Sequence, residues 1–366
     1  MTAPRSLGWL RAAALLWIGS LAGFAIGIEW YRSRPPAPPP PSGHIDLVGA
    51  GATFPYPLYR RWFADYRAET GVRINYYSVG TGEGVRLLLD GEADFGAADR
   101  PLSAAERARA RCGPVEIATA VGAVAVVVNL PRIASPVRLD PEVLAGIYLG
   151  GITRWDDPAL RALNPALALP AMPIRLAHRG PTSGTGAVLA AYLDDSPAWR
   201  AARRGAAAPW AVGERIEGNE GVAAHVQANE GGLGFVELAY AQQNRLATAA
   251  LRNAAGAFVR PDSFALARAA EELLAPAGAD TLLALVGARG ADAYPVGAVT
   301  RLVVDRALGD STLAAHFIAF ATWALRDGGA SAAQLGYVPL PAPVRRRAHA
   351  QLAALVPGRC PTPRTD

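Results

Sequence analysis

The nine residues RGPTSGTGA, from Arg179 to Ala187, combine one arginine, three hydroxyl side chains and three glycines, and they contain no carboxylate. Guanidinium, hydroxyl and backbone amide groups all donate hydrogen bonds to anions, and arginine matches the geometry of tetrahedral oxyanions. The apolar positions after Gly184 have helical spacing, which predicts a strand-to-helix turn here. A helix N-terminus offers free amides and a positive dipole end. The stretch therefore predicts an anion-binding site.

Two enzymatic interpretations of the same residues are poorly supported. A nucleotide-binding loop needs a lysine at the outer phosphates, and the sequence contains no lysine. A hydrolase elbow needs glycine two residues before and after its serine, whereas Ser183 has Pro181 and Thr185 at these positions. A membrane-tethered phosphohydrolase with Ser183 as nucleophile stays as an alternative.

Two further turns have a similar composition of glycine and hydroxyl residues. GAGATFP, from Gly49 to Pro55, and GTGEG, from Gly80 to Gly84, each end a predicted strand and begin a predicted helix. Open α/β sheets bind ligands at the carboxyl ends of their strands. Each turn taken singly is equally typical of a helix cap, but together they predict one binding crevice.

Asp99, at the end of DFGAAD, places a carboxylate next to this crevice. A carboxylate belongs in an anion site only if the ligand carries a proton for it to accept, as phosphate does near neutral pH and sulfate does not. Such a site rejects an analogue that lacks the proton, because the carboxylate is left unpaired against like charge. A capping or surface role for Asp99 is the alternative.

The elements that position these turns alternate in type. Strands at 45–48, 72–77 and 93–97 and helices at 57–70 and 83–90 predict a parallel sheet with helical crossovers. Further predictions are a capping box at Ser103–Glu106, one or two buried strands at 117–128, a helix capped by Asp140 and ending at 149, strands at 174–177 and 299–304, and a helix at 312–325.

Composition indicates a globular chain, with 51% hydrophobic and 18% charged residues among 366 and a net charge of +5. The two cysteines, Cys112 and Cys360, form no metal-binding cluster with histidine, so neither a metal nor a cofactor is expected. Their spacing does not decide whether they pair.

The amino-terminal segment predicts export. An uncharged run from Ala12 to Ile28 follows two arginines, which favours a cytoplasmic N-terminus and an extracytoplasmic remainder. We interpret 1–33 as a cytoplasmic tip with a retained signal-anchor helix, and a cleaved soluble form is the alternative. Residues 34–43 are proline-rich and predict an extended linker.

Seven stretches resemble, in this order, the family of periplasmic phosphate-binding proteins of high-affinity phosphate ABC importers. They are GAGATFPYPLYRRW, ETGVRINYYSVGTGEGV, DFGAADRPLS, GIYLGGITRWDDPAL, LNPALALP, GNEGVAAHVQANEGGLGFVELAYA and DAYPV. The resemblance extends over most of the chain from Asp46 to about Val344. It implies a type II periplasmic-binding-protein fold, in which two α/β lobes joined by two crossing strands close around one phosphate.

The resemblance also implies a set of ligand-binding residues. Carried over position by position, the set comprises the hydroxyl of Thr53, the amide of Phe54, Thr81, the acceptor Asp99, the guanidinium of Arg179, and the hydroxyls and amides of Ser183, Gly184 and Thr185. The family commonly has an aspartate two residues after the arginine, where this chain has Pro181. Something other than residue 181 must therefore hold Arg179.

These observations together give the expected organisation and function. Lobe one is expected at 44–121 with 300–355, lobe two at 122–299, a tail at 356–366, and the crossing strands near 117–128 and 295–304. The resemblance implies an extracytoplasmic substrate-binding component that delivers inorganic phosphate to a membrane permease, with no catalysis and no nucleic-acid partner. Binding of another oxyanion, sulfate or molybdate, is the first alternative.

Overall fold

The computed structural model describes residues 46–133, 135–203, 209–277, 285–308 and 311–357. All of them belong to the compact unit that begins at Ile45. The predicted anchor and proline-rich linker lie outside the described residues. No helix in the described ranges has the length and apolar character needed to cross a membrane.

The first part of this unit is a parallel sheet with helical crossovers. Strand β1 (Leu47–Gly51) pairs in parallel with β2 (Ile74–Ser78) on one side and with β3 (Phe95–Ala98) on the other. The connecting helices are α2 (Tyr56–Thr70) and α3 (Thr81–Asp90). The β-α-β-α-β order predicted from the sequence is confirmed.

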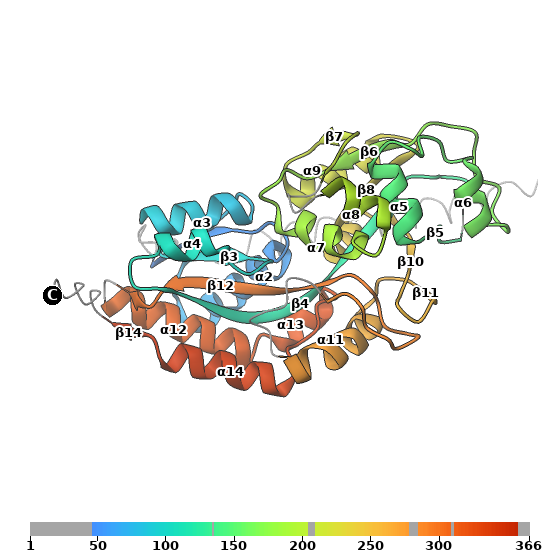
Figure 1. Ribbon diagram of the computed structural model, residues 1–366. Helices are drawn as coiled ribbons and strands as arrows, with labels where there is room; N and C mark the ends of the chain where they lie inside the picture. Colours follow the sequence, from blue (N-terminus) through green and yellow to red (C-terminus); the bar gives the residue numbers. More distant parts are fainter. Residues whose placement is uncertain (1–45, 134, 204–208, 278–284, 309–310, 358–366) are drawn as a thin grey trace, which may run out of the picture. The chain divides into compact units, whose positions relative to one another are not determined.

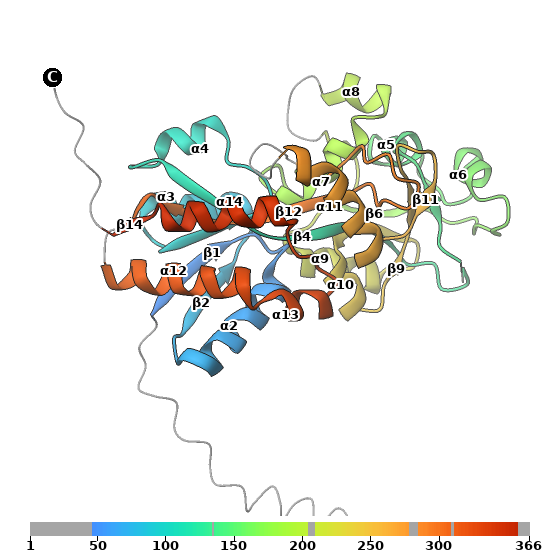
Figure 2. The same cartoon turned by 90° about the horizontal axis from the view of Figure 1, so that it is seen from below.

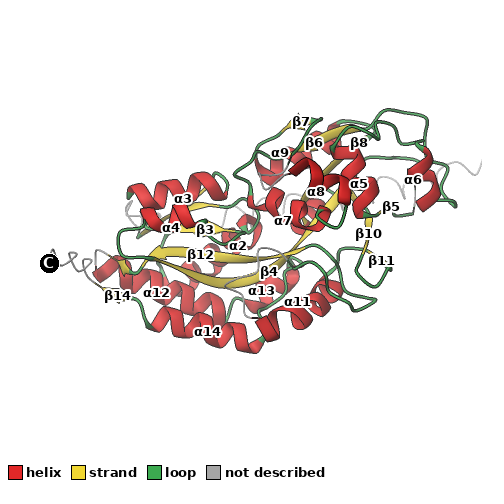
Figure 3. Ribbon diagram, viewed as in Figure 1, coloured by secondary structure: helices red, strands yellow, loops and turns green. Residues whose placement is uncertain are grey.

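Two long strands join the two lobes of the fold. Strand β4 (Pro114–Val128) is one continuous strand, and β12 (Gly297–Asp305) runs antiparallel to it, between β3 and β4 (Figure 3). Beyond this pairing, β4 continues at Val124 along β8 (Gly232–Glu237). Its alanine and β-branched residues are buried, as suits a strand covered on both faces. The two-lobed periplasmic-binding-protein fold is therefore confirmed.

The second lobe extends the sheet from β8. Strand β6 (Arg175–His178) is parallel to β8 and to the short β7 (Glu214–Arg215), while β9 (Ala247–Thr248) pairs with β4. A separate small sheet contains β5 (Arg138–Leu139), β10 (Ala250–Arg252) and β11 (Phe258–Val259). Around these strands lie α5 (Pro141–Tyr148), α6 (Pro158–Leu163), α7 (Gly184–Leu193), α8 (Pro197–Arg203), α9 (Gly218–Ala228) and α10 (Leu238–Gln243).

The remaining elements pack on the first lobe and on the crossing strands. They are α4 (Ala104–Arg109), α11 (Ser263–Ala277), β13 (Ala307–Leu308), α12 (Ser311–Arg326), α13 (Gly329–Gln334), α14 (Ala342–Ala353) and β14 (Val356–Pro357). Helices α12 and α14 lie side by side against the sheet (Figures 1 and 2). Helix α11 contacts α14, β4 and β12. The residue limits of the two lobes stay a prediction.

Aromatic side chains fill the space between the first sheet and its helices. Phe63 of α2, Phe95 of β3 and Phe317 of α12 are connected through ring contacts at centroid distances of 6.5 and 5.7 Å. Burial of such large apolar side chains is the main favourable contribution to folding, at about 25 cal/mol per Å². This core fixes the strand ends from which the candidate site is built.

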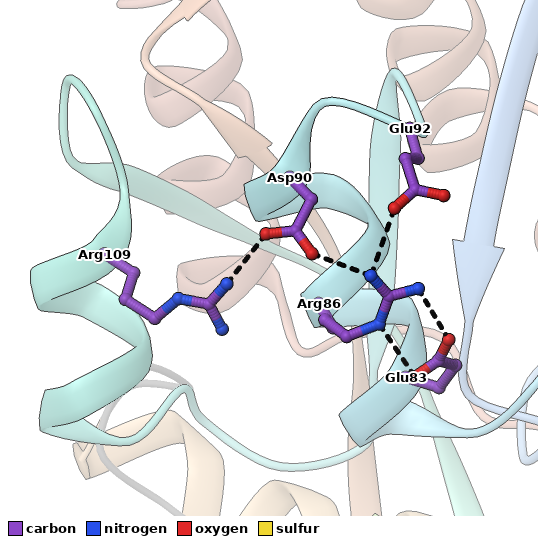
Figure 4. A network of polar contacts seen from close by, with 5 residues as sticks. All are labelled: Glu83, Arg86, Asp90, Glu92 and Arg109. Carbon is purple, nitrogen blue, oxygen red and sulfur yellow. Dashed lines mark hydrogen bonds and ion pairs between the residues drawn. The ribbon is translucent and has the colours of Figure 1, made fainter.

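Local capping and surface ion pairs hold the helix ends in place. Ser103 and Glu106 form the predicted capping box, and Asp140 accepts a 2.8 Å hydrogen bond from the amide of Val143. Arg86 contacts Glu83, Asp90 and Glu92, and Asp90 also contacts Arg109, which links α3 to α4 (Figure 4). The side chains of this network are exposed, so its contribution is small.

One of the two cysteines lies in the part of the chain that the structure describes. Cys112 is disulfide-bonded. Cys360 lies outside the described residues.

Candidate functional site

The polar turns predicted from the sequence all follow strand ends of the long sheet. Thr53 follows β1, Thr81 begins α3 after β2, and Asp99 follows β3, whereas Arg179 and the start of α7 follow β6. Their side chains are buried despite their polarity, with exposed fractions of 1–7%. Buried polar groups need hydrogen-bond partners, so the contacts among them define the site.

Asp99 lies where the two lobes meet. The hydroxyl of Thr81 donates to its Oδ1, and the hydroxyl of Thr185, from the other lobe, donates to its Oδ2 at 3.1 Å. A Cβ atom added to Gly184 would lie 1.4 Å from Oδ1, so there is space for a hydrogen atom only. Asp99 is thus an acceptor packed directly against the first turn of α7.

The N-terminus of α7 supplies backbone donors beside this carboxylate. Ser183 is the N-cap, and its Oγ accepts a 3.2 Å hydrogen bond from the amide of Gly186. The amides of Gly184 and Thr185, at the first two helical positions, have no acceptor within the helix. They point along the positive end of the helix dipole, which is the geometry of an anion site.

Arg179 adds a buried positive charge. Its side chain is 3% exposed, and neither Nε nor Nη1 has a hydrogen-bond partner among the described residues. Burial lowers the pKa of the guanidinium, and the carboxylates of Asp99, Glu217 and Glu220 act in the opposite direction. Donors of a buried guanidinium are costly to leave unpaired, so this arrangement suits an anionic ligand.

Pro181 lies on the exposed side of the same turn. The carboxylates that act on Arg179 are those of Asp99 and of Glu217 and Glu220, which flank the N-terminus of α9. The expectation that something other than residue 181 stabilises Arg179 is consistent with these contributions.

Thr53 and Phe54 are held from three directions. Asn219 donates to Thr53 Oγ1 through its backbone amide at 3.2 Å and through Nδ2 at 2.7 Å. The carbonyl of Thr53 accepts from the hydroxyl of Tyr240 at 2.7 Å, and that of Phe54 accepts from Tyr337 at 2.8 Å. Because both acceptor positions of the Thr53 hydroxyl are used, its hydrogen is directed away from Asn219 and remains free to donate.

The structure therefore brings the predicted residues into one cluster and adds others to which the sequence motifs assign no role. Asn219 also approaches Thr185 Oγ1, at 3.4 Å, so that it connects a hydroxyl from each lobe. Its Oδ1 accepts from the amide of Glu237 at 2.8 Å. The stretch GNEGVAAHVQANEGGLGFVELAYA contains both residues and Tyr240, and it was the only sequence signal for them.

The described contacts offer little to enzymatic chemistry at Ser183. Its Oγ is used as a helix cap, and the Nδ1 atom of the neighbouring His178 lies 3.1 Å from the carbonyl of Arg179. Across the described ranges, no group of three histidine, cysteine or carboxylate side chains is arranged to hold a metal ion. What the site does contain is a set of donors and one acceptor.

A family model and several sequence relatives assign the chain to the same family. The family model described as "PBP superfamily domain" matches residues 36–327. The phosphate-binding protein PstS of Xylella fastidiosa strain Temecula1 is 38% identical over 309 residues, covering 82% of this chain and 84% of that protein. PstS of Pasteurella multocida is 37% identical over 310 residues, covering 83% and 89%.

Solved structures confirm the fold. The chain is similar to a phosphate-binding protein from Stenotrophomonas maltophilia, with a TM-score of 0.63 and 17% identity over 84% of this chain and 94% of that one. It is also similar to PfluDING, a high-affinity periplasmic phosphate-binding protein solved with phosphate bound, with a TM-score of 0.65 and 20% identity over 84% and 93%. The chain therefore belongs to the PBP superfamily and, within it, to the family of PstS phosphate-binding proteins.

Proposed function

We propose that this protein binds inorganic phosphate between its lobes and delivers it to the permease of an ABC importer as the substrate-binding component. The observation that carries the proposal is a buried carboxylate, Asp99, set against the N-terminus of α7, with a buried guanidinium nearby whose Nε and Nη1 have no partner among the described residues. An acceptor in such a place suits an oxyanion that brings its own proton. The names of the PstS relatives support the same ligand.

The ligand-binding set that we propose is the one inferred from the sequence. It comprises Thr53, Phe54, Thr81, Asp99, Arg179, Ser183, Gly184 and Thr185. A carboxylate has about four lone-pair positions, and the two threonine hydroxyls on Asp99 occupy two of them. Acceptor capacity therefore remains for a hydrogen on phosphate.

Selectivity between oxyanions is the sharpest test. We expect calorimetry on the purified full-length chain to show phosphate binding, and sulfate binding weaker by at least a factor of about 10³, because sulfate would leave Asp99 unpaired against like charge. Asp99→Asn should reduce this ratio by at least tenfold. Asp90→Asn, which alters an exposed carboxylate of the same lobe, is the matched control and should leave the ratio unchanged.

Two outcomes would replace the proposal. Equal affinity for phosphate and sulfate, or for molybdate, would assign another oxyanion to the site. Turnover of a chromogenic phosphate ester that disappears in Ser183→Ala would assign a phosphohydrolase. The proposed role is binding and release without a chemical step.

We further propose an extracytoplasmic location, with the N-terminal segment kept as a membrane tether. The apolar run from Ala12 to Ile28 and the arginines before it support this location, although they lie outside the described residues. The similar PfluDING protein is periplasmic by its description. The mass of the mature N-terminus tests the tether, since a cleaved protein would lack residues 1 to about 25.

A further inference from the structure

Glu237 is a buried carboxyl group that the proposed ligand set does not use. It is the last residue of β8 and pairs with Val124 of β4, next to Ala123, which pairs with Gly297 of β12. Glu237 therefore lies at the point along β4 where pairing with β12 ends and pairing with β8 begins. Its exposed fraction is 0%.

The carboxyl group accepts from the backbone at the start of α10, and the amide of Leu238 and the hydroxyl of Tyr337 also act on it. Oε2 accepts from the amide of Ala239 at 2.7 Å, which caps the start of α10. Oε1 has no hydrogen-bond partner among the described residues. The interactions that act on this group include no positive charge, and burial raises its pKa well above the usual range. An ionised carboxylate would be uncompensated here.

The hydroxyl groups around Glu237 have already used their hydrogens. Tyr337 lies close enough to Glu237 for the two groups to shift each other's pKa, but its hydroxyl donates to the carbonyl of Phe54. Tyr240 of α10 donates to the carbonyl of Thr53, and Tyr294 donates to that of Val124 at 2.8 Å. A tyrosine hydroxyl has one hydrogen, so toward Glu237 the hydroxyl of Tyr337 can only accept.

Two charged groups of opposite sign lie near Tyr240. Glu220 of α9 is negative and Arg179 is positive, and both act on Tyr240 together with Glu237. Neither of them acts on Glu237 itself, whose surroundings are tyrosines and backbone amides. With no cation to compensate a carboxylate, these surroundings favour a Glu237 that keeps its own hydrogen.

We infer that Glu237 is held as a neutral carboxylic acid and acts as a positioning residue for the turn at Thr53 and Phe54. While Glu237 keeps its proton, Tyr337 can accept from it and still donate to the carbonyl of Phe54. If Glu237 loses the proton, the carboxylate competes for the hydrogen of Tyr337, and the carbonyl of Phe54 loses its donor. The turn that places the Thr53 hydroxyl and the Phe54 amide would then lose one of the hydrogen bonds that hold it.

The pH dependence follows in sign from the raised pKa. In the unfolded chain the carboxyl releases its proton near its ordinary pKa of 4.5, whereas the folded protein keeps it. Between 4.5 and the folded pKa the folded state therefore binds one more proton, so its stability falls as the pH rises. Glutamine at this position carries no such proton and escapes this loss.

The experiment compares wild type with Glu237→Gln, which keeps an oxygen for Ala239 and adds a donor for Tyr337. The ratio of the variant's folding equilibrium constant to that of wild type, from urea titrations, should rise about tenfold per pH unit above 4.5, until the folded pKa is reached. The infrared band of a protonated carboxylic acid should be present in wild type and reduced in the variant. A flat ratio together with no such band would overturn the inference.

The positioning role has its own readout, which rests on the proposed function. Glu237→Gln should bind phosphate within about threefold of wild type at pH 7, whereas Glu237→Ala should bind at least tenfold more weakly, or fail to fold. Equal weakening in Glu237→Gln would refute the positioning role. If wild type binds no phosphate at all, the proposed function fails. The infrared band and the stability ratio still decide whether Glu237 carries a proton.

Discussion

Addition of one methyl group at Gly184 should prevent the lobes from closing on a ligand. A Cβ at this position would lie 1.4 Å from Asp99 Oδ1 and 2.3 Å from its Cγ, whereas non-bonded contacts of a Cβ stay above 3.0 Å. Gly184 is the first residue of α7 and does not have a positive φ, so alanine suits its backbone. Gly184→Ala therefore changes the distance between lobes and leaves the local fold intact.

The expected magnitude follows from this overlap. Asp99 and the start of α7 must separate by about 1.6 Å, the difference between 3.0 and 1.4 Å. That displacement breaks the 3.1 Å hydrogen bond from Thr185 to Asp99, and a ligand that contacts both Asp99 and α7 loses its contact with one of them. Loss of two hydrogen bonds to charged groups costs about 3–6 kcal/mol, which corresponds to roughly 10²- to 10⁴-fold in affinity.

Calorimetry measures the affinity for phosphate, and a thermal melt without ligand measures the stability of the variant. Gly184→Ala should bind phosphate at least about 100-fold more weakly than wild type and still unfold cooperatively, with a melting temperature lowered by no more than loss of the Thr185–Asp99 hydrogen bond would cause. Gly186→Ala is the matched control, because a Cβ there meets nothing nearer than 3.5 Å. It should bind phosphate within about threefold of wild type. Binding of Gly184→Ala at near wild-type affinity would show that the ligand does not contact both Asp99 and α7.

Two further predictions concern the supports of the site and of its lobe. Asn219→Ala removes the side-chain donor to Thr53, though not the backbone one, and leaves the buried amide of Glu237 unpaired, so the free energy of unfolding should fall by about 1–3 kcal/mol and phosphate affinity should fall with it. Asn129→Ala, which removes hydrogen bonds to the carbonyls of Val226 and Gln227 near the C-terminal end of α9, should lower stability alone. An unchanged affinity in Asn219→Ala would argue against its role. Glu106→Gln tests the opposite sign of pH linkage to Glu237. Burial raises the pKa of Glu106, but hydrogen bonds from Arg100 and Ser103 outweigh it and lower the pKa to about 2. Its contribution is thus present above 4.5 and lost toward pH 2, so the variant should be less stable than wild type at pH 7 and equal to it near pH 2 in urea titrations.

Local chemistry in the sequence was enough to predict the β-α-β-α-β start of the first lobe and two of the helix caps. The alternation that predicted β1 to β3, the capping box at Ser103 and the cap at Asp140 all depend on residues close together in the chain. The strand at 117–128 was predicted as one or two strands and is a single strand, β4. Its even run of small and β-branched residues contains no signal that separates these two cases.

The supports of the candidate site could not be predicted in the same way. Asn219, Tyr240 and Tyr337 contact Thr53 and Phe54 from 166, 187 and 283 positions away along the chain. No periodicity or spacing connects residues so distant, and a buried asparagine or tyrosine has many other uses in a core. The polar turns were predictable because strand ends gather them at one edge, while the partners of each hydroxyl depend on tertiary packing.

The place of β12 in the sheet has a consequence for biosynthesis. It lies between β3 and β4, although Thr300 on β12 and its hydrogen-bond partner Thr119 on β4 are 181 positions apart. Until translation has passed Asp305, β3 and β4 have no strand between them, and closing so long a loop carries an entropic cost. The first lobe therefore completes its sheet only when most of the chain exists.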